Sequence, residues 1–183
     1  MHITYSIVKS PLGYILIAAT ARGIATMRFG DSEPILQAEL VDTYPEADCE
    51  RDERGLCQWV TLLQNYLQGL PIPLTVPLDV HGSTFQWKVW EALRAIPFGS
   101  TRSYREIAQA IGQPTAARAV ARACATNPVA VFIPCHRVVR GNGQLGGYYW
   151  GLERKQQLLD LERNTIIQPL AMSAQRLGAA TGS

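Results

Sequence analysis

Residues 103–123 read SYREIAQAIGQPTAARAVARA, and this pattern predicts two short helices separated by a tight turn. Ser103 and Glu106 have the spacing of a capping box, in which each side chain satisfies a free backbone N–H at the start of a helix. The first helix is expected over residues 104–111, and the glycine that follows stops it. The second is expected to begin near residues 114–115. Two short helices joined in this way are typical of a helix-turn-helix unit.

The residues around this unit predict the rest of a small helical domain. Ser83 and Gln86 form a second capping box, which opens a helix over residues 85–93. The apolar run at 129–133 is expected to be a buried strand, and residues 151–162 a closing helix. We therefore expect a winged-helix-like C-terminal domain.

The first part of the chain has a different pattern. Apolar and polar residues alternate over 3–8, 13–18 and 24–29, which predicts a small antiparallel sheet. Helical patterns follow from Pro34 and over residues 56–67, where the second helix ends at a glycine. The N-terminal part is therefore expected to be an αβ domain.

A boundary between the two domains is expected at residues 70–77, LPIPLTVP, because three prolines so close together exclude a helix. The charge changes sign there. Residues 1–80 carry 5 basic and 10 acidic groups (net −5), and residues 81–183 carry 12 basic and 5 acidic groups (net +7). The predicted division is an N-terminal domain over 1–76, a C-terminal domain over 77–165 and a flexible tail over 166–183.

Composition excludes several classes of protein. With 183 residues, 47% hydrophobic and 17% charged, the chain is long enough for one large or two small domains. It has no apolar run near the roughly 20 residues that cross a bilayer, and its first residues do not resemble an export signal, so a cytoplasmic protein without membrane contact is expected. Its four cysteines form no CxxC pair and its three histidines lack zinc-ligand spacing, so we expect neither a metal nor a disulfide.

The basic residues favour an anionic partner. Only three of the 17 are lysines, and six arginines crowd residues 102–140. Arginine suits phosphate binding and stacking. The expected second helix of the pair is mostly alanine with Arg118 as its long side chain, which favours a backbone able to enter a nucleic-acid groove. The alternative is an alanine-rich helix packed closely against a neighbour.

One segment carries residues suited to covalent chemistry. Cys135 follows the expected strand and precedes His136 and Arg137, whose positive charge would favour a thiolate. Neighbours in an extended chain point to opposite sides, so His136 should reach the thiol through a water or a bend in the backbone. Glu162 on the closing helix is placed to orient His136. These residues alone suggest a cysteine hydrolase weakly, and an inert buried thiol is the alternative.

The same region resembles a known family. The string IPCHRVV at 133–139, preceded by ARAV at 117–120 and Asn127 and followed by GL, RK and LL within 151–159, strongly resembles the O6-alkylguanine-DNA alkyltransferases. The bacterial adaptive-response protein carries a similar C-terminal part. The resemblance is dense over 77–162 and looser before it, where the family has a ribonuclease-H-like αβ domain. It implies an α+β fold with a helix-turn-helix, winged-helix-like C-terminal domain.

The resemblance also implies a reaction. Cys135 would accept a methyl or other alkyl group from the O6 atom of a flipped guanine and would become inactive. His136 would take the thiol proton through water and Glu162 would hold His136, while Asn127 would brace the turn beneath them. A thioether is a poor leaving group toward water, so each molecule should act once.

Further residues would bind the substrate. The resemblance implies that Tyr104 promotes nucleotide rotation and donates to guanine N3, and that Arg118 fills the vacated base stack. Arg105 would contact phosphate, and backbone groups of Val138 and Tyr149, with Cys135, would read the guanine edges. The implied partner is double-stranded DNA that carries O6-alkylguanine, approached from the minor groove. No cofactor and no obligate protein partner are implied, and a monomer is expected.

The chain departs from some relatives. Nothing at its start supplies the zinc ligands of members that also regulate genes, so repair without metal-linked regulation is expected. Bulky neighbours of the expected pocket would limit large adducts such as benzyl groups. These neighbours are Cys124, Tyr148, Tyr149 and Trp150. Two alternatives stay open, namely a DNA-binding lesion sensor without chemistry and a cysteine hydrolase with many turnovers.

Overall fold

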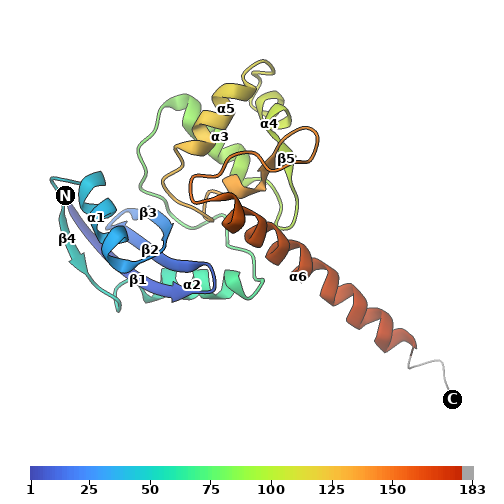
Figure 1. Cartoon of the computed structure of the whole chain (residues 1–183), viewed down its shortest axis with the longest axis horizontal. Helices are drawn as coiled ribbons and strands as arrows, with labels where there is room; N and C mark the ends of the chain where they lie inside the picture. Colours follow the sequence, from blue (N-terminus) through green and yellow to red (C-terminus); the bar gives the residue numbers. More distant parts are fainter. Residues whose placement is uncertain (179–183) are drawn as a thin grey trace.

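The computed structural model describes residues 1–178 of the chain, with side chains described for 1–165. An N-terminal sheet domain lies beside a C-terminal helical domain (Figure 1), so the predicted α+β fold class is confirmed. The sheet has four strands in the order β3-β2-β1-β4. Their bounds are β1 (His2–Ser10), β2 (Gly13–Thr20), β3 (Gly23–Gly30) and β4 (Asp48–Arg51).

The first three strands pair antiparallel as predicted, and β4 adds an unpredicted parallel edge beside β1. Side chains alternate between the two faces of a strand. In β2, Leu16 joins the cluster formed with helix α1 (Glu33–Thr43). Its neighbours Ile15 and Ile17 join the larger cluster that includes helix α2 (Cys57–Leu67). This larger core continues into the C-terminal domain, which gives the two domains a common core.

The segment between the domains is fixed to the sheet. The Ile24 N–H donates to the Pro77 carbonyl at 3.0 Å, and the Asp79 N–H donates to the Ile24 carbonyl at 2.8 Å. Gly23 permits this approach, because a Cβ there would lie 2.6 Å from the Pro77 oxygen. The linker residues around Pro77 are therefore held against β3.

The C-terminal domain confirms both predicted capping boxes. The Ser83 and Ser103 hydroxyls each accept from the backbone N–H three residues on, at 3.2 Å in both cases, and the Gln86 and Glu106 side chains accept in return. The helices of the domain are α3 (Thr84–Arg94), α4 (Tyr104–Ala110), α5 (Ala117–Ala125), the single 3-10 turn η1 (Cys135–Arg137) and α6 (Leu152–Gly178). A short parallel pair joins β5 (Arg102–Ser103) to β6 (Val138–Val139).

The strand predicted at 129–133 is wrong. Val131 has φ of +67°, a left-handed conformation that a β-branched residue rarely adopts, and only Val129 bridges to the sheet. The segment is a series of buried turns because the Asn127 side chain binds backbone groups at both of its ends, the Val129 N–H and the Ile133 carbonyl. Cys135 consequently lies on a 3-10 turn and not at the end of a strand.

The backbone of residues 166–178 continues α6, and the flexible tail predicted over 166–183 stays a prediction. The last part of the predicted tail, 179–183, lies outside the described residues. Within the described part of the chain, no helix has the length and apolar character needed to span a membrane.

Candidate active site

A cavity of about 320 Å³ opens between α4, α5 and the loop before α6, and the predicted acceptor cysteine is part of its wall. Most of its lining is apolar or aromatic. The lining residues are Tyr104, Ala121, Cys124, Ala125, Cys135, Gly147, Tyr148 and Tyr149. Its size and character suit a planar organic group.

The turn around Asn127 positions Cys135. The Asn127 Nδ2 donates to the Ile133 carbonyl at 2.8 Å and to Cys135 Sγ at 3.1 Å. The Asn127 Oδ1 accepts from the Val129 N–H at 2.9 Å. One buried amide thus ties together both ends of the turn and the thiol, so the predicted bracing contact is present.

The thiol of Cys135 is only 4% exposed, and burial raises its pKa to about 11. The hydrogen bond from Asn127 and the charge of Lys155 lower the pKa in part. Lys155 is fully buried, and its Nζ donates to the Val138 carbonyl at 2.6 Å. The sequence prediction that Arg137 favours the thiolate is wrong, because Arg137 is directed to a carboxylate and the nearby cation is Lys155.

His136 is fully buried and is held by Glu162. The Nε2–H of His136 donates to Glu162 Oε1 at 2.7 Å, as predicted, which leaves Nδ1 as the unprotonated nitrogen. Nδ1 has no partner among the described residues. Burial lowers the pKa of His136, so its imidazole is neutral and Nδ1 is able to accept a proton. The described side chains form no direct hydrogen bond between His136 and Cys135, so the predicted route through a water or a bend in the backbone stays a prediction.

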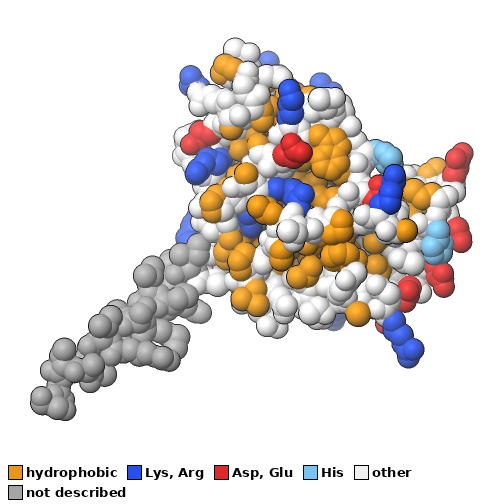
Figure 2. Space-filling model, turned by 180° about the vertical axis from the view of Figure 1, so that it is seen from behind, with side chains coloured by type: hydrophobic (Ala, Val, Ile, Leu, Met, Phe, Trp, Pro, Cys, Tyr) orange, Lys and Arg blue, Asp and Glu red, His pale blue; other side chains and the backbone are white. Residues whose placement is uncertain are grey.

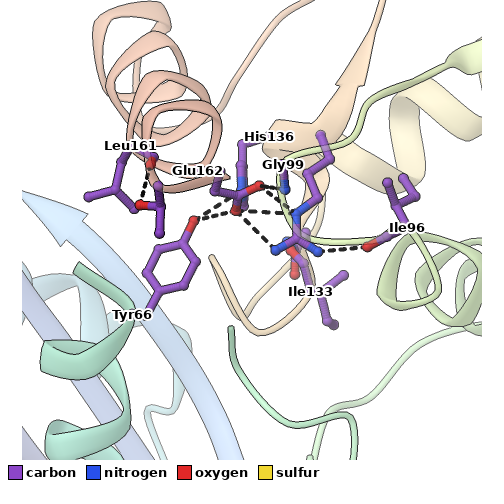
Figure 3. A network of polar contacts seen from close by, with 10 residues as sticks. Tyr66, Ile96, Gly99, Ile133, His136, Leu161 and Glu162 are labelled. Atoms are coloured by element: carbon purple, nitrogen blue, oxygen red, sulfur yellow. Dashed lines mark hydrogen bonds and ion pairs between the residues drawn. The ribbon is translucent and has the colours of Figure 1, made fainter. Parts of the chain in front are cut away.

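Glu162 is the centre of a larger polar network than the sequence indicated (Figure 3). Arg137 donates to both of its oxygens, with its Nε 2.9 Å from Oε2 and its Nη2 3.0 Å from Oε1. The Gly99 N–H donates to Oε2 at 3.0 Å, and the Tyr66 hydroxyl donates to Oε1 at 2.6 Å. The hydrogen bonds from His136 and Arg137, together with the positive charge of Arg137, hold the pKa of Glu162 at about 2 despite its burial.

Sequence reasoning missed three parts of this site, namely Tyr66, Lys155 and the contact from Gly99. Arg137 was noticed, but its partner was not. The sequence did indicate that Arg137 has a carboxylate partner, because an arginine that follows a buried apolar run needs one. Tyr66 gave no signal, because its position fits an ordinary core residue of an amphipathic helix.

The two arginines predicted to contact DNA lie outside the cavity wall, whereas Tyr104 is part of it. Arg105 on α4 and Arg118 on α5 are exposed, and Arg118 lies one helical turn before Ala121 of the wall. Val138 is fully buried, and its carbonyl is bound to Lys155. Tyr149 lines the cavity and is 63% exposed.

Charge is distributed as the sequence predicted. On the face shown in Figure 2, acidic side chains gather at the end of the N-terminal domain, whereas lysine and arginine side chains are spread over the rest. Within residues 1–165, no three His, Cys, Asp or Glu side chains lie close enough together to hold a metal ion. Arg105 and Arg118 are exposed on α4 and α5, the helices that line the cavity, so the surface there is suited to an anion.

Two family models match the chain. One is described as the ribonuclease-like domain of 6-O-methylguanine DNA methyltransferase and covers residues 3–80. The other is described as the DNA binding domain of the same protein and covers residues 84–164.

Individual relatives agree with this match. The chain is 47% identical over 160 residues to the bifunctional transcriptional activator/DNA repair enzyme Ada of Escherichia coli, which covers 87% of this chain but only 45% of Ada. It is 42% identical over 163 residues to the methylated-DNA–protein-cysteine methyltransferase of Mycolicibacterium paratuberculosis, which covers 88% of this chain and 93% of that protein.

A solved structure is also similar. The chain matches Mycobacterium tuberculosis OGT in complex with DNA with a TM-score of 0.76 and 37% identity, over 90% of this chain and 94% of that one. The chain therefore belongs to the 6-O-methylguanine DNA methyltransferase family, in which one relative is named a DNA repair enzyme and another a methylated-DNA–protein-cysteine methyltransferase.

Proposed function

We propose that this chain repairs O6-alkylguanine in double-stranded DNA by moving the alkyl group onto Cys135, once per molecule. The observation that carries the proposal is a thiol in the wall of an apolar cavity, next in sequence to a buried neutral histidine with an unoccupied Nδ1. This pair supplies a nucleophile and a base for it. The family match supports the substrate class.

The reaction follows from these positions. His136 Nδ1 takes the Cys135 proton through a water, and the resulting charge is shared with Glu162 through the 2.7 Å hydrogen bond. The sulfur then attacks the alkyl carbon in line, and the S–C bond forms as the C–O6 bond breaks. The bonding electron pair stays on guanine, which takes up one proton to balance the proton that the thiol lost. The thioether that remains is stable in water, so the protein is consumed.

Access to the O6 atom requires the nucleotide to leave the base stack. Extrusion of a base costs a few kcal/mol, part of which an inserted side chain returns. We assign Arg118 to that insertion from the minor groove, because it is exposed beside the cavity wall. Tyr104 lines the cavity and is placed to donate to guanine N3.

Other parts of the proposal concern contacts and context. Arg105 binds phosphate, while backbone groups of Cys135, Val138 and Tyr149 read the guanine. We also propose that the boundary between the two domains lies between residues 76 and 77. The protein acts without a cofactor or an obligate protein partner, and it is located in the cytoplasm. The chain spans about half the length of the first curated relatives that it matches, covering 45% of Ada.

Intact-mass spectrometry tests the proposal directly. Wild-type protein and the Cys135→Ala variant are incubated with a duplex that holds one O6-methylguanine, and the products are mapped by peptide. One methyl group on Cys135 in stoichiometric amount, and none in the variant, is the expected result. Binding without a mass change would leave only a lesion sensor, and repeated turnover of an ester substrate would indicate a hydrolase.

A further inference from the structure

Tyr66 connects the N-terminal domain to the active site of the C-terminal domain. It lies on α2 and is 1% exposed, and its hydroxyl donates to Glu162 Oε1 at 2.6 Å. The same oxygen atom of Tyr66 lies 3.2 Å from His136 Nε2. Figure 3 shows the Tyr66 side chain directed from α2 toward Glu162. None of the residues of α2 lines the cavity, so Tyr66 acts only through other residues.

Glu162 Oε1 is shared between competing donors. His136, Arg137 and Tyr66 all donate to it, at 2.7, 3.0 and 2.6 Å. Each donor stabilises the negative charge of the oxygen and so weakens its attraction for the others. Arg137 and the Gly99 N–H fix the other oxygen, so the carboxylate keeps its place without Tyr66. The Tyr66 hydroxyl is therefore a neutral donor. It changes how strongly Glu162 Oε1 accepts hydrogen bonds more than it changes where that oxygen lies.

We propose that Tyr66 is a positioning residue through which the N-terminal domain limits how strongly Glu162 accepts from His136, so that the imidazole stays neutral and ready for the thiol proton. This inference rests on the proposed function for its consequence in catalysis. Several groups face His136 and act on its charge. They are Tyr66 on α2, Cys135 and Arg137 on η1, and Lys155 and Glu162 on α6.

The Tyr66→Phe variant tests this inference, because it removes the hydroxyl and keeps the ring that packs edge-on against Phe98 and His136. Tyr44→Phe is the matched control. Tyr44 lies in the same domain as Tyr66, and its hydroxyl donates to the Ala25 carbonyl at 3.2 Å. This hydrogen bond involves no residue of the Glu162 network. The full chain has three histidines, so His136 is followed by NMR titration in the absence of DNA.

In Tyr66→Phe we expect the His136 titration to move to higher pH by about 0.5–1 unit, because Glu162 then accepts more strongly. The acidic limb of the pH profile for single-turnover methyl transfer moves in the same direction. Tyr44→Phe leaves both curves unchanged. In a Glu162→Gln background, Tyr66→Phe produces no further shift, since the coupling passes through the carboxylate.

An unchanged His136 titration in Tyr66→Phe, or a shift to lower pH, overturns the inference. A uniform loss of rate at every pH also overturns it, because that result describes a purely structural role. Failure of the wild-type protein to take up methyl refutes the proposed function instead. The NMR titration separates the two, since it needs neither DNA nor turnover.

Discussion

Replacement of Glu162 by glutamine tests the charge arrangement of the site. The carboxylate is fully buried and accepts from Tyr66, Gly99, His136 and Arg137. In Glu162→Gln the side-chain amide presents an NH2 group to the donors, and the buried Arg137 side chain loses its counter-ion. Breaking a buried ion pair from one side costs about 3–5 kcal/mol, so the variant is expected to be less stable at pH 7 by that amount.

The pKa of Glu162 gives the pH dependence of this effect. Its value falls from 4.5 to about 2 on folding, a difference of about 2.5 units, and one unit corresponds to about 1.4 kcal/mol. The folded-state pKa is depressed, so the contribution is complete above pH 4.5 and is lost as the pH falls toward 2. About 3 kcal/mol of wild-type stability should therefore disappear over this window.

Urea unfolding between pH 2 and 7 measures both quantities. The stability difference between wild type and Glu162→Gln should be largest above pH 4.5 and shrink by about 3 kcal/mol toward pH 2. Glu153→Gln is the matched control, because Glu153 is an exposed carboxyl on the same helix and should change stability by less than about 0.5 kcal/mol. A difference that is constant with pH, or below about 1 kcal/mol at pH 7, would refute the reasoning.

Three other substitutions have defined outcomes. Asn127→Ala removes the hydrogen bond to Cys135, so the thiol pKa rises further and the rate of methyl transfer at pH 7 falls at least about 10-fold in a single-turnover assay. Gly146→Ala places a Cβ 2.1 Å from the Tyr104 hydroxyl, which displaces that side chain and weakens binding of a lesion duplex in a fluorescence titration. Arg118→Ala slows transfer from duplex DNA while leaving the melting temperature within about 1 °C, because the side chain is exposed.

Local signals predicted much of the fold. The capping boxes at Ser83 and Ser103 fixed the starts of two helices, since the hydroxyl and the acceptor three residues later satisfy specific N–H groups. The alternation over the first three strands predicted their faces. The strand expected at 129–133 failed for a physical reason, because the apolar run is buried but its backbone is bound by the Asn127 side chain instead of a neighbouring strand.

The polar network of the site was predicted only in part. The place of Glu162 on the closing helix, and then the resemblance to the family, predicted its pairing with His136, which the structure contains. Tyr66 lies 96 residues before Glu162 and has the spacing of an ordinary core residue. A hydroxyl directed to a distant carboxylate leaves no periodic pattern in a sequence, so only the fold reveals it.

The electrostatics of the site bear on how the proposed acceptor thiol is kept before it meets DNA. Burial raises the pKa of Cys135 to about 11, so the protonated thiol predominates at pH 7. Lys155 and Asn127 lower that pKa only in part, and in the proposed reaction His136 removes the proton. Because Glu162 stays ionised above about pH 2, the acceptor for the resulting imidazolium charge is already in place. In the proposed reaction, reactivity then depends on a substrate that brings an alkyl carbon into the cavity, where Cys135 accepts it.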